Sequence, residues 1–337
     1  MLQLSTWLSE VEKKVHDTDQ QNAVKGYIEH LSSKNLPIIF DINHLSLLVG
    51  IKKKVIQSII YKSTKFYYKA DIPKRKGGVR TLTIPFPVLK YIQKWIVIEI
   101  LTKVSAHRAV MAFAPRTSIL KNAQLHCIEG ELLSLDIKDF FPSINIKRII
   151  ALFIYLGYSP KVSFFLARIC CEGNSLPQGA PTSPYLSNLV SNRLDKRLAK
   201  LSEINQLIYT RYADDLSFSG LEISDNFFIK VSDILNSEGF LINPDKIKRY
   251  KRGDPKKITG ISIATNIPKI PRSLKRALRQ EIHYIKRFGL MNHLEKTKKL
   301  DPIYIDRIRG RLNFWRFIEA QNPYPGEALK SLKESKG

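Results

Sequence analysis

The chain has 337 residues, of which 44% are hydrophobic, and only 16 are glycine and 17 proline. This composition excludes fibrous and low-complexity proteins and allows two or three compact folded units. There are 55 Lys and Arg residues against 30 Asp and Glu, which gives a formal net charge of +25. Such an excess in a folded chain favours a polyanionic partner over the alternative of a merely basic protein.

Secretion, membrane insertion and zinc chemistry find no support in the sequence. The N-terminal MLQLSTWLSEVEKK lacks the basic start and apolar centre of a signal peptide, and runs such as WIVIEIL are too short to span a membrane. Three cysteines, Cys127, Cys170 and Cys171, lack metal-ligand spacing, and the seven histidines include no HExxH pattern. We therefore expect a cytoplasmic protein with free thiols and no membrane contact.

The N-terminal residues 1–70 predict helices, because apolar residues recur at helical spacing through LSTWLSEVEKKV and HLSLLVGIKKKVIQSIIY. Asp41 and Asn43 offer N-cap chemistry ahead of the second run. The character then changes at DIPKRKGGVRTLTIP, where Gly77-Gly78 predicts a hairpin turn before a β-type run. An amphipathic helix is expected from Pro87 to about Val104.

Strands and buried helices are mixed in the middle of the chain. Residues 131–143, ELLSLDIKDFFPS, predict a strand that leads into a helix start, and IKRIIALFIYLG and KVSFFLARICC are typical of buried helices. The turn-rich SLPQGAPTSP is expected to precede a helix over residues 182–201. LIYTRYADDLSFSG predicts a hairpin with its turn at Asp214 and Asp215, and NFFIKVSDILNSEGF a helix that ends near Gly239. Without regular βαβ alternation, these elements predict an α+β fold.

The last part of the chain is strongly basic. Residues 242–288 contain 14 Lys and Arg against 3 Asp and Glu. The segments SLKRALRQEIHYIKRF and IDRIRGRLNFWRFIEA predict helices with basic faces and apolar backs. Charge on well-patterned helices favours a nucleic-acid surface, and the alternative is a solvated face.

Two adjacent aspartates, Asp214 and Asp215, lie in TRYADDLSF between two β-prone runs. Strand side chains alternate between faces, but a tight turn breaks that alternation and can bring both carboxylates to one sheet edge. Their repulsion is relieved if divalent cations lie between them. Mg²⁺ prefers carboxylate, phosphate and water oxygens, and Asp136, after the apolar run of SLDIKDFF, is the expected third carboxylate. Three carboxylates that hold two Mg²⁺ ions suit in-line attack at phosphorus.

Four motifs resemble, in order and spacing, the palm motifs of reverse transcriptases: SLDIKDFFPS, LPQGAPTSP, YADD and GFLINPDKI. KGGVRTLTIP ahead of them resembles the first fingers motif of that family. The resemblance implies a right-hand polymerase with an N-terminal helical region over residues 1–70, fingers and palm over 71–262, and a helical, RNA-binding thumb over 263–337.

The resemblance also implies roles for individual residues. Asp136, Asp214 and Asp215 would be the catalytic, metal-binding carboxylates, with the main-chain carbonyl of Ile137 as an extra ligand. The residues implied to contact the incoming dNTP are Arg80 and Lys76 at the triphosphate, Gln178 near the sugar, and Lys246 at the pyrophosphate, to which it could donate a proton.

Phe141 and Asp139 follow the first palm carboxylate. The aromatic ring of Phe141 would lie under the sugar and clash with a ribonucleotide 2′-hydroxyl, which favours dNTPs over NTPs. Asp139 is expected to orient the loop or to cap the following helix.

Two further features resemble bacterial retron reverse transcriptases. Asn122 and His126 fit the NAxxH pattern of that group, and Ile258-Thr259-Gly260 stands where its members carry VTG. This resemblance implies a cognate non-coding RNA as template, a guanosine 2′-hydroxyl as primer, and branched multicopy single-stranded DNA as product. It also implies an effector or toxin partner and a role in antiphage defence.

The residues predicted to contact RNA lie in these two motifs and in the basic C-terminal helices. They are Asn122, His126, Thr259, Gly260, Lys275, Arg276 and Arg279. Phe314, Trp315 and Phe317 are expected to pack the thumb core, with base stacking as the alternative. Two other functions stay open from the sequence. One is a short bacterial reverse transcriptase without branched priming, and the other is a catalytically idle RNA-binding antitoxin scaffold.

Overall fold

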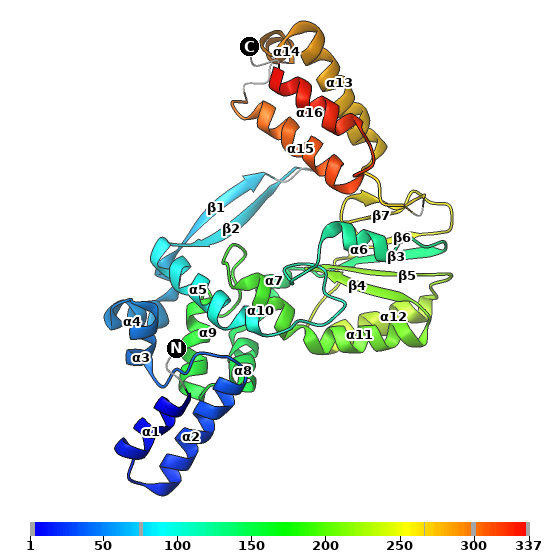
Figure 1. Ribbon diagram of the computed structural model, residues 1–337. Coiled ribbons are helices and arrows are strands. Elements are labelled where there is room, and N and C mark those ends of the chain that lie inside the picture. Colours follow the sequence, from blue (N-terminus) through cyan, green and yellow to red (C-terminus); the bar gives the residue numbers. More distant parts are fainter. Residues whose placement is uncertain (1–3, 74–76, 266, 298–300, 335–337) are drawn as a thin grey trace.

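A computed structural model describes residues 4–73, 77–265, 267–297 and 301–334 (Figure 1). Helices surround antiparallel sheets, so the predicted α+β class is confirmed. Apolar side chains form two clusters. The larger one joins the N-terminal helices to one face of the central sheet, and the smaller one fills the C-terminal helices. Within the described residues, no helix is long and apolar enough to cross a membrane.

The N-terminal part is helical, as predicted. Asp41 caps α3 by accepting a hydrogen bond from the His44 amide at 2.8 Å. Gly50, with φ of +69°, ends this helix, so the apolar run after residue 44 forms two helices and not one. The elements are α1 (Leu4–Lys14), α2 (Thr18–Ser33), α3 (Ile42–Val49), α4 (Lys53–Tyr61) and the 3₁₀ turn η1 (Ser63–Phe66).

The predicted glycine hairpin is formed by β1 (Tyr67–Pro73) and β2 (Val79–Pro85), which pair in antiparallel register from Tyr67–Pro85 to Pro73–Val79. Gly77 and Gly78 both have positive φ, the backbone region that glycine enters without strain. Helix α5 (Pro87–Glu99) follows and gives way to the 3₁₀ turn η2 (Leu101–Lys103), so the regular helix ends earlier than predicted.

The central sheet contains β3 (Glu131–Asp136), β4 (Ile208–Tyr212), β5 (Asp215–Gly220) and β6 (Lys248–Tyr250), in the antiparallel order β4-β5-β3-β6. One face is apolar, with Leu133, Leu216 and Phe218 buried. Figure 1 shows α11 (Asn192–Ile204) and α12 (Asp225–Ser237) beneath the sheet. Residues 182–201 were predicted as one helix but form α10 (Ser183–Val190) and α11, separated at Ser191.

Four further elements connect these parts. They are α6 (Ile119–Leu125), α7 (Phe140–Ser143), α8 (Ile146–Leu156) and α9 (Pro160–Cys170). A 3₁₀ turn, η3 (Pro244–Lys246), precedes β6.

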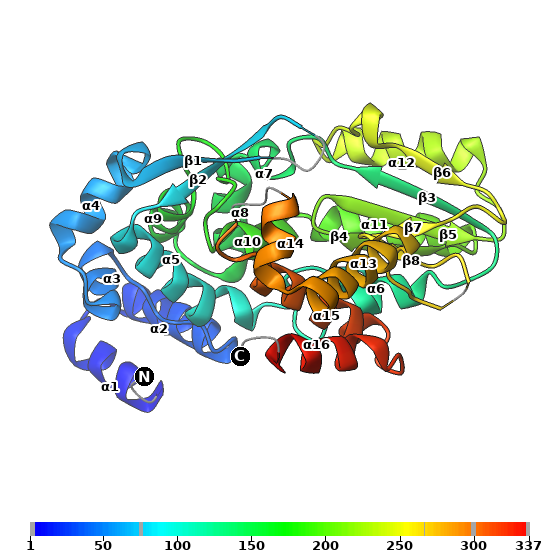
Figure 2. The same cartoon turned by 90° about the horizontal axis from the view of Figure 1, so that it is seen from above.

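The C-terminal helices stand above the sheet on the side opposite α11 and α12, and Figure 2 shows them from above. Their core contains Leu278, Ile282 and Trp315, all nearly inaccessible. Trp315 therefore packs the core, whereas Phe317 is exposed. The elements are the two-stranded β7 (Lys257–Ile258) and β8 (Ile261–Ser262), followed by α13 (Arg272–Phe288), α14 (Leu290–Thr297), α15 (Tyr304–Ile318) and α16 (Tyr324–Glu334).

Candidate active site

Asp136 and Asp215 are direct partners on the neighbouring antiparallel strands β3 and β5. Each strand alternates its side chains between faces, so the apolar Leu135 and Leu216 point into the core. The two aspartates consequently share the opposite face at the end of the sheet. Carboxylates from two segments about 80 residues apart in the sequence are thus brought side by side by the strand register alone.

Asp214 occupies the turn between β4 and β5, as predicted. Ala213 before it has φ of +57°, and this left-handed residue allows the chain to reverse within two residues. The Ile137 amide donates to the Asp214 carbonyl at 2.9 Å, which joins the turn to the end of β3. All three carboxylates therefore lie at one edge of the sheet.

A lysine partly neutralises this acidic edge. Lys246, from η3, lies with its Nζ 2.7 Å from Oδ2 of Asp136. Neighbouring Asn243 holds the same aspartate twice, since its main-chain amide donates to the Asp136 carbonyl at 2.8 Å and its side-chain amide to Oδ1 at 3.4 Å. The NPDK segment is thereby fastened to the first carboxylate, as the order of the motifs implied.

The negative charge that Lys246 does not compensate still destabilises the ionised forms of Asp214 and Asp215. Asp215 reaches solvent, but removal of water by the surrounding protein, and then the charge of Asp214, raises its pKa to about 6. The same desolvation, with the charge of Asp136, raises the pKa of Asp214, and the cations Lys246 and Arg80 oppose the shift. Carboxylates whose ionised forms are destabilised in this way gain from an added cation.

The donor set suits Mg²⁺, which takes hard oxygen ligands and keeps several waters. Among the residues that the structure describes, no group of three or more His, Cys, Asp or Glu side chains is arranged to hold a metal ion by itself. An open arrangement fits an ion that binds through one or two carboxylates and completes its coordination with substrate phosphates.

Behind the aspartate turn is a buried ion pair that the sequence reasoning missed. Arg211 and Asp195 are both fully buried and form a two-pronged contact, with Nε to Oδ1 at 2.7 Å and a second bond at 2.6 Å. Arg211 also donates to the Ala213 carbonyl at 3.2 Å, and the Tyr209 hydroxyl donates to Asp195 at 2.8 Å. The one available signal was an arginine inside an otherwise buried strand.

Two of the segments that carry predicted nucleotide contacts, β2 and the LPQG loop, lie side by side. The Thr83 amide of β2 donates to the Gln178 carbonyl at 2.8 Å. Gly179 has φ of +138°, and a Cβ there would approach the Thr83 carbonyl oxygen to 2.8 Å, so the close contact requires glycine. Arg80 on the same strand is exposed, and its charge acts on Asp214.

Three further residues were assigned roles from the motifs, namely Phe141, Asp139 and Lys76. Phe141, in α7, is half-buried, with its ring 5.5 Å from that of Phe140. Asp139 precedes α7 in left-handed backbone, and its side chain makes no cap hydrogen bond, so the expected cap is not formed. Lys76 lies outside the described residues.

Burial corrects the prediction that Asn122 and His126 contact RNA. Each is only 1% exposed, and their side chains bond to Thr210 and Ser219 of the central sheet. Side chains enclosed between a helix and a sheet cannot reach an RNA.

The predicted RNA contacts in the C-terminal region differ in accessibility. Thr259 and Gly260 form the turn between β7 and β8, both with positive φ. Lys275 is partly buried and forms an ion pair with Glu319, with 2.7 Å between Nζ and Oε2. Arg276 is exposed, and Arg279 lies over the rings of Trp315 and Tyr324 at 5.6 and 5.1 Å.

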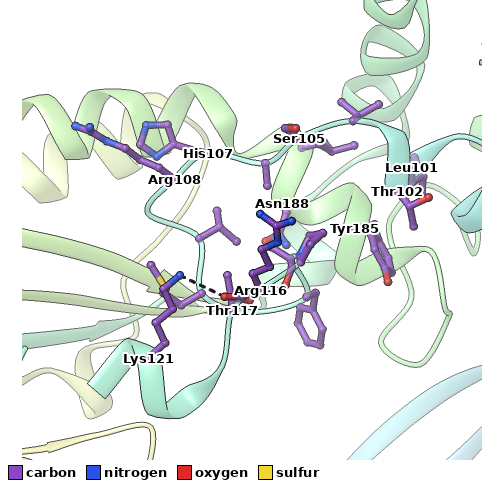
Figure 3. A pocket seen from close by; sticks show the side chains of 18 residues that line it. Leu101, Thr102, Ser105, His107, Arg108, Arg116, Thr117, Lys121, Tyr185 and Asn188 are labelled. Carbon is purple, nitrogen blue, oxygen red and sulfur yellow. Dashed lines mark hydrogen bonds between the residues drawn. The ribbon is translucent and has the colours of Figure 1, made fainter. Parts of the chain in front are cut away.

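A groove of about 660 Å³ lies beside the outer edge of β4, where residues 109–111 pair with Arg211, and it is lined by the loop after η2 and by α10 (Figure 3). Its lining includes apolar residues such as Val110, Met111 and Leu189, and its basic lining residues are His107, Arg108, Arg116 and Lys121. Phe113 and Arg116 have φ of +56° and +60°, a backbone region that bulky residues rarely enter. None of the three carboxylates lines this groove.

Comparison with known proteins agrees with this geometry. Residues 72–284 match the family model "Reverse transcriptase (RNA-dependent DNA polymerase)". The chain is 34% identical to Retron Ec86 reverse transcriptase of Escherichia coli over 87% of this chain and 89% of that protein. It is 33% identical to Retron Mx65 reverse transcriptase of Myxococcus xanthus over 79% of this chain and 69% of that protein.

Among solved structures, apo telomerase from Candida tropicalis aligns with a TM-score of 0.46 and 12% identity, over 79% of this chain and 57% of that one. The family match, the extent of the retron similarity and the carboxylate edge agree. The chain belongs to the reverse transcriptases, RNA-directed DNA polymerases with a right-hand fold, and among them to the bacterial retron reverse transcriptases.

Proposed function

We propose that this enzyme copies part of a cognate non-coding RNA into DNA, beginning at the 2′-hydroxyl of a guanosine in that RNA. The product is a branched RNA–DNA molecule, multicopy single-stranded DNA. The observation that carries the catalytic part is the pairing of Asp136 with Asp215 beside Asp214. The similarity to retron enzymes supports the rest.

Asp136, Asp214 and Asp215, with the Ile137 carbonyl, would hold two Mg²⁺ ions. When bound, these ions would increase the nucleophilicity of the attacking hydroxyl and stabilise the charge on the leaving oxygen. Asp214, in the turn between the paired strands, would be the main metal ligand of the three.

The cationic and aromatic residues around the carboxylates position the nucleotide. Arg80 and Lys76 bind the triphosphate, since guanidinium and ammonium groups match phosphate oxygens. Gln178 lies against the sugar, and Lys246 leaves Asp136 to donate a proton to the departing pyrophosphate. Phe141 excludes the 2′-hydroxyl of ribonucleotides, which makes dNTPs the substrates.

The basic groove at the edge of β4 is the proposed path of the unpaired template. Its cationic lining residues attract phosphates, and its apolar lining residues, with Phe113, suit exposed bases. A second groove of about 1200 Å³ lies between the β7–β8 turn and α13 and α15, and its lining includes Thr259, Gly260, Arg307 and Arg311. We assign it, together with the exposed Arg276 and Arg279, to structured parts of the cognate RNA.

The boundaries at residues 70 and 262 divide the proposed N-terminal, fingers–palm and thumb regions. We further propose that the enzyme acts in antiphage defence with an effector or toxin protein. The three free thiols suit a reducing cytoplasm.

Incubation of the purified enzyme with the RNA that copurifies with it, Mg²⁺ and dNTPs tests the proposal. We expect DNA joined to an internal guanosine, which RNase digestion reduces to a branched nucleotide that a 2′,5′-debranching enzyme cleaves. A linear product extended from an RNA 3′ end would refute branched priming and leave the polymerase assignment intact.

A further inference from the structure

The side chains of the NAxxH segment form one chain of hydrogen bonds with the central sheet. His126 lies with Nδ1 2.6 Å from the Ser219 hydroxyl and Nε2 2.8 Å from the Thr210 hydroxyl. The Thr210 hydroxyl in turn lies 2.6 Å from Oδ1 of Asn122. All four residues are nearly inaccessible to solvent. Short polar contacts in such a setting have well-defined geometry and resist exchange with water.

The chain of bonds has one consistent direction. An amide Oδ1 only accepts, so the Thr210 hydroxyl donates to Asn122 and is free to accept from His126 Nε2–H. The histidine Nδ1 then accepts from Ser219. Burial lowers the pKa of His126 to about 4, in agreement with a neutral ring. Each hydroxyl and each ring nitrogen is thereby satisfied.

The two hydroxyls belong to the strands of the catalytic hairpin. Thr210 is in β4 and Ser219 in β5, and each is four residues from the nearer aspartate of the turn. The NAxxH segment therefore holds the two strands whose connection carries Asp214 and Asp215.

An adjacent side of α6 packs on the β7–β8 hairpin, at the boundary between the palm and the thumb. Ala123 is fully buried in the same apolar cluster as Ile258 and Ile261 of the β7–β8 hairpin. Ile119, Leu120 and Cys127 are partly buried against this cluster. Figure 1 shows α6 above the sheet and below the thumb helices. The polar side of α6 thus faces the hydroxyls of β4 and β5, and its apolar side joins a cluster that contains Leu132 of β3, the β7–β8 hairpin and the thumb helices.

We propose that Asn122 and His126 are positioning residues that join the palm to the thumb. They fix α6 on the catalytic hairpin, and α6 carries the β7–β8 hairpin and, through it, the thumb helices. The consequence is functional: the thumb must keep a constant position over the product duplex while nucleotides are added. This role goes beyond branched priming and does not depend on it.

Two substitutions of similar size provide the test. Thr210→Val removes the shared hydroxyl and keeps the side-chain shape, whereas Thr210→Ser keeps the hydroxyl. We expect Thr210→Val to shorten the DNA made per binding event several-fold in the presence of a trap, with the rate of the first nucleotide addition changed less than about twofold. Thr210→Ser should restore product length, and Ser219→Ala should reproduce part of the defect without a volume increase.

A direct RNA contact by the NAxxH segment makes the opposite prediction. In that case His126→Ala would weaken RNA binding, while Thr210→Val would change neither RNA affinity nor product length, and the proposal would be overturned. If the proposal holds, His126→Ala and Thr210→Val should both leave RNA affinity unchanged, and their effects on product length should be non-additive.

Discussion

Lys246 and Asp136 form an ion pair with 2.7 Å between Nζ and Oδ2, although they are 110 residues apart. The ammonium group of Lys246 thus pairs with one of the three carboxylates that are assigned to metal binding. Because Lys246 is half-exposed, it can leave Asp136 without crossing the core.

Lys246→Ala tests this relationship. We expect the metal-free protein to melt at a lower temperature, because Asp136, Asp214 and Asp215 lose their shared cation, and the melting temperature to rise more on addition of Mg²⁺ than in the wild type. The rate of nucleotide addition should fall by about 10²-fold or more, the usual contribution of a positioned proton donor. Scanning calorimetry and single-turnover kinetics measure the two effects, and an unchanged rate would exclude Lys246 from proton transfer.

Asp214→Asn should abolish DNA synthesis, by about 10³-fold or more, because an amide cannot replace an anionic ligand of a divalent cation. Binding of the cognate RNA should persist, since the basic surfaces are unchanged. The matched control is Asp233→Asn on the exposed side of α12, which removes the same charge away from the site. Gel-shift and primer-extension assays separate the outcomes, and undiminished synthesis by Asp214→Asn would disprove the metal assignment.

The raised pKa of Asp215 predicts how stability depends on pH. Its folded pKa, about 6, exceeds the ordinary value of 3.8, so folding favours the protonated form. This contribution is fully present below about pH 4 and is lost as the pH rises through 6. Asp215→Asn, which stays neutral, should therefore raise the melting temperature of the metal-free protein at pH 7.5 but not at pH 4. An equal effect at both pH values would contradict a raised pKa of Asp215.

Substitutions of the buried pair Arg211 and Asp195 should affect the stability of the fold and the rate of nucleotide addition differently. Arg211→Met leaves a buried, unpaired carboxylate and should destabilise the fold by about 3–5 kcal/mol in urea unfolding. Adding Asp195→Asn should recover much of this loss. Nucleotide addition should remain slow in the double variant, because the Ala213 carbonyl has lost the donor that holds the aspartate turn. Full recovery of the rate would limit the pair to a structural role.

Phe141→Ala should weaken the preference for deoxyribose over ribose in the incoming nucleotide. If the ring excludes the 2′-hydroxyl, removing it should lower the preference for dNTP over NTP by about tenfold or more, equivalent to roughly 1.4 kcal/mol. Competition between dGTP and GTP measures the ratio. Phe140→Ala, at the neighbouring buried ring, is the control for general loosening of α7, and a preference as strong as before in Phe141→Ala would exclude the gate.

Local chemistry explains why many features were predictable from the sequence. The glycine hairpin, the Asp41 cap and the turn at Asp214 follow from backbone preferences that act over a few residues. Helix interruptions were less predictable. Ser191 separates α10 from α11 within a run whose helical pattern is continuous.

The sequence by itself determined the polymerase class, through motifs whose order and chemistry suffice to identify three carboxylates and a nearby lysine. The tertiary structure alone decided which polar residues face solvent and which are enclosed. Asn122 and His126 were assigned to RNA recognition because they fit the NAxxH pattern of the retron enzymes. They are buried instead, since hydroxyls on two distant strands complete their hydrogen bonds. Such pairing over 84 to 93 residues leaves no local pattern, because it depends on strand register and not on neighbours in the chain.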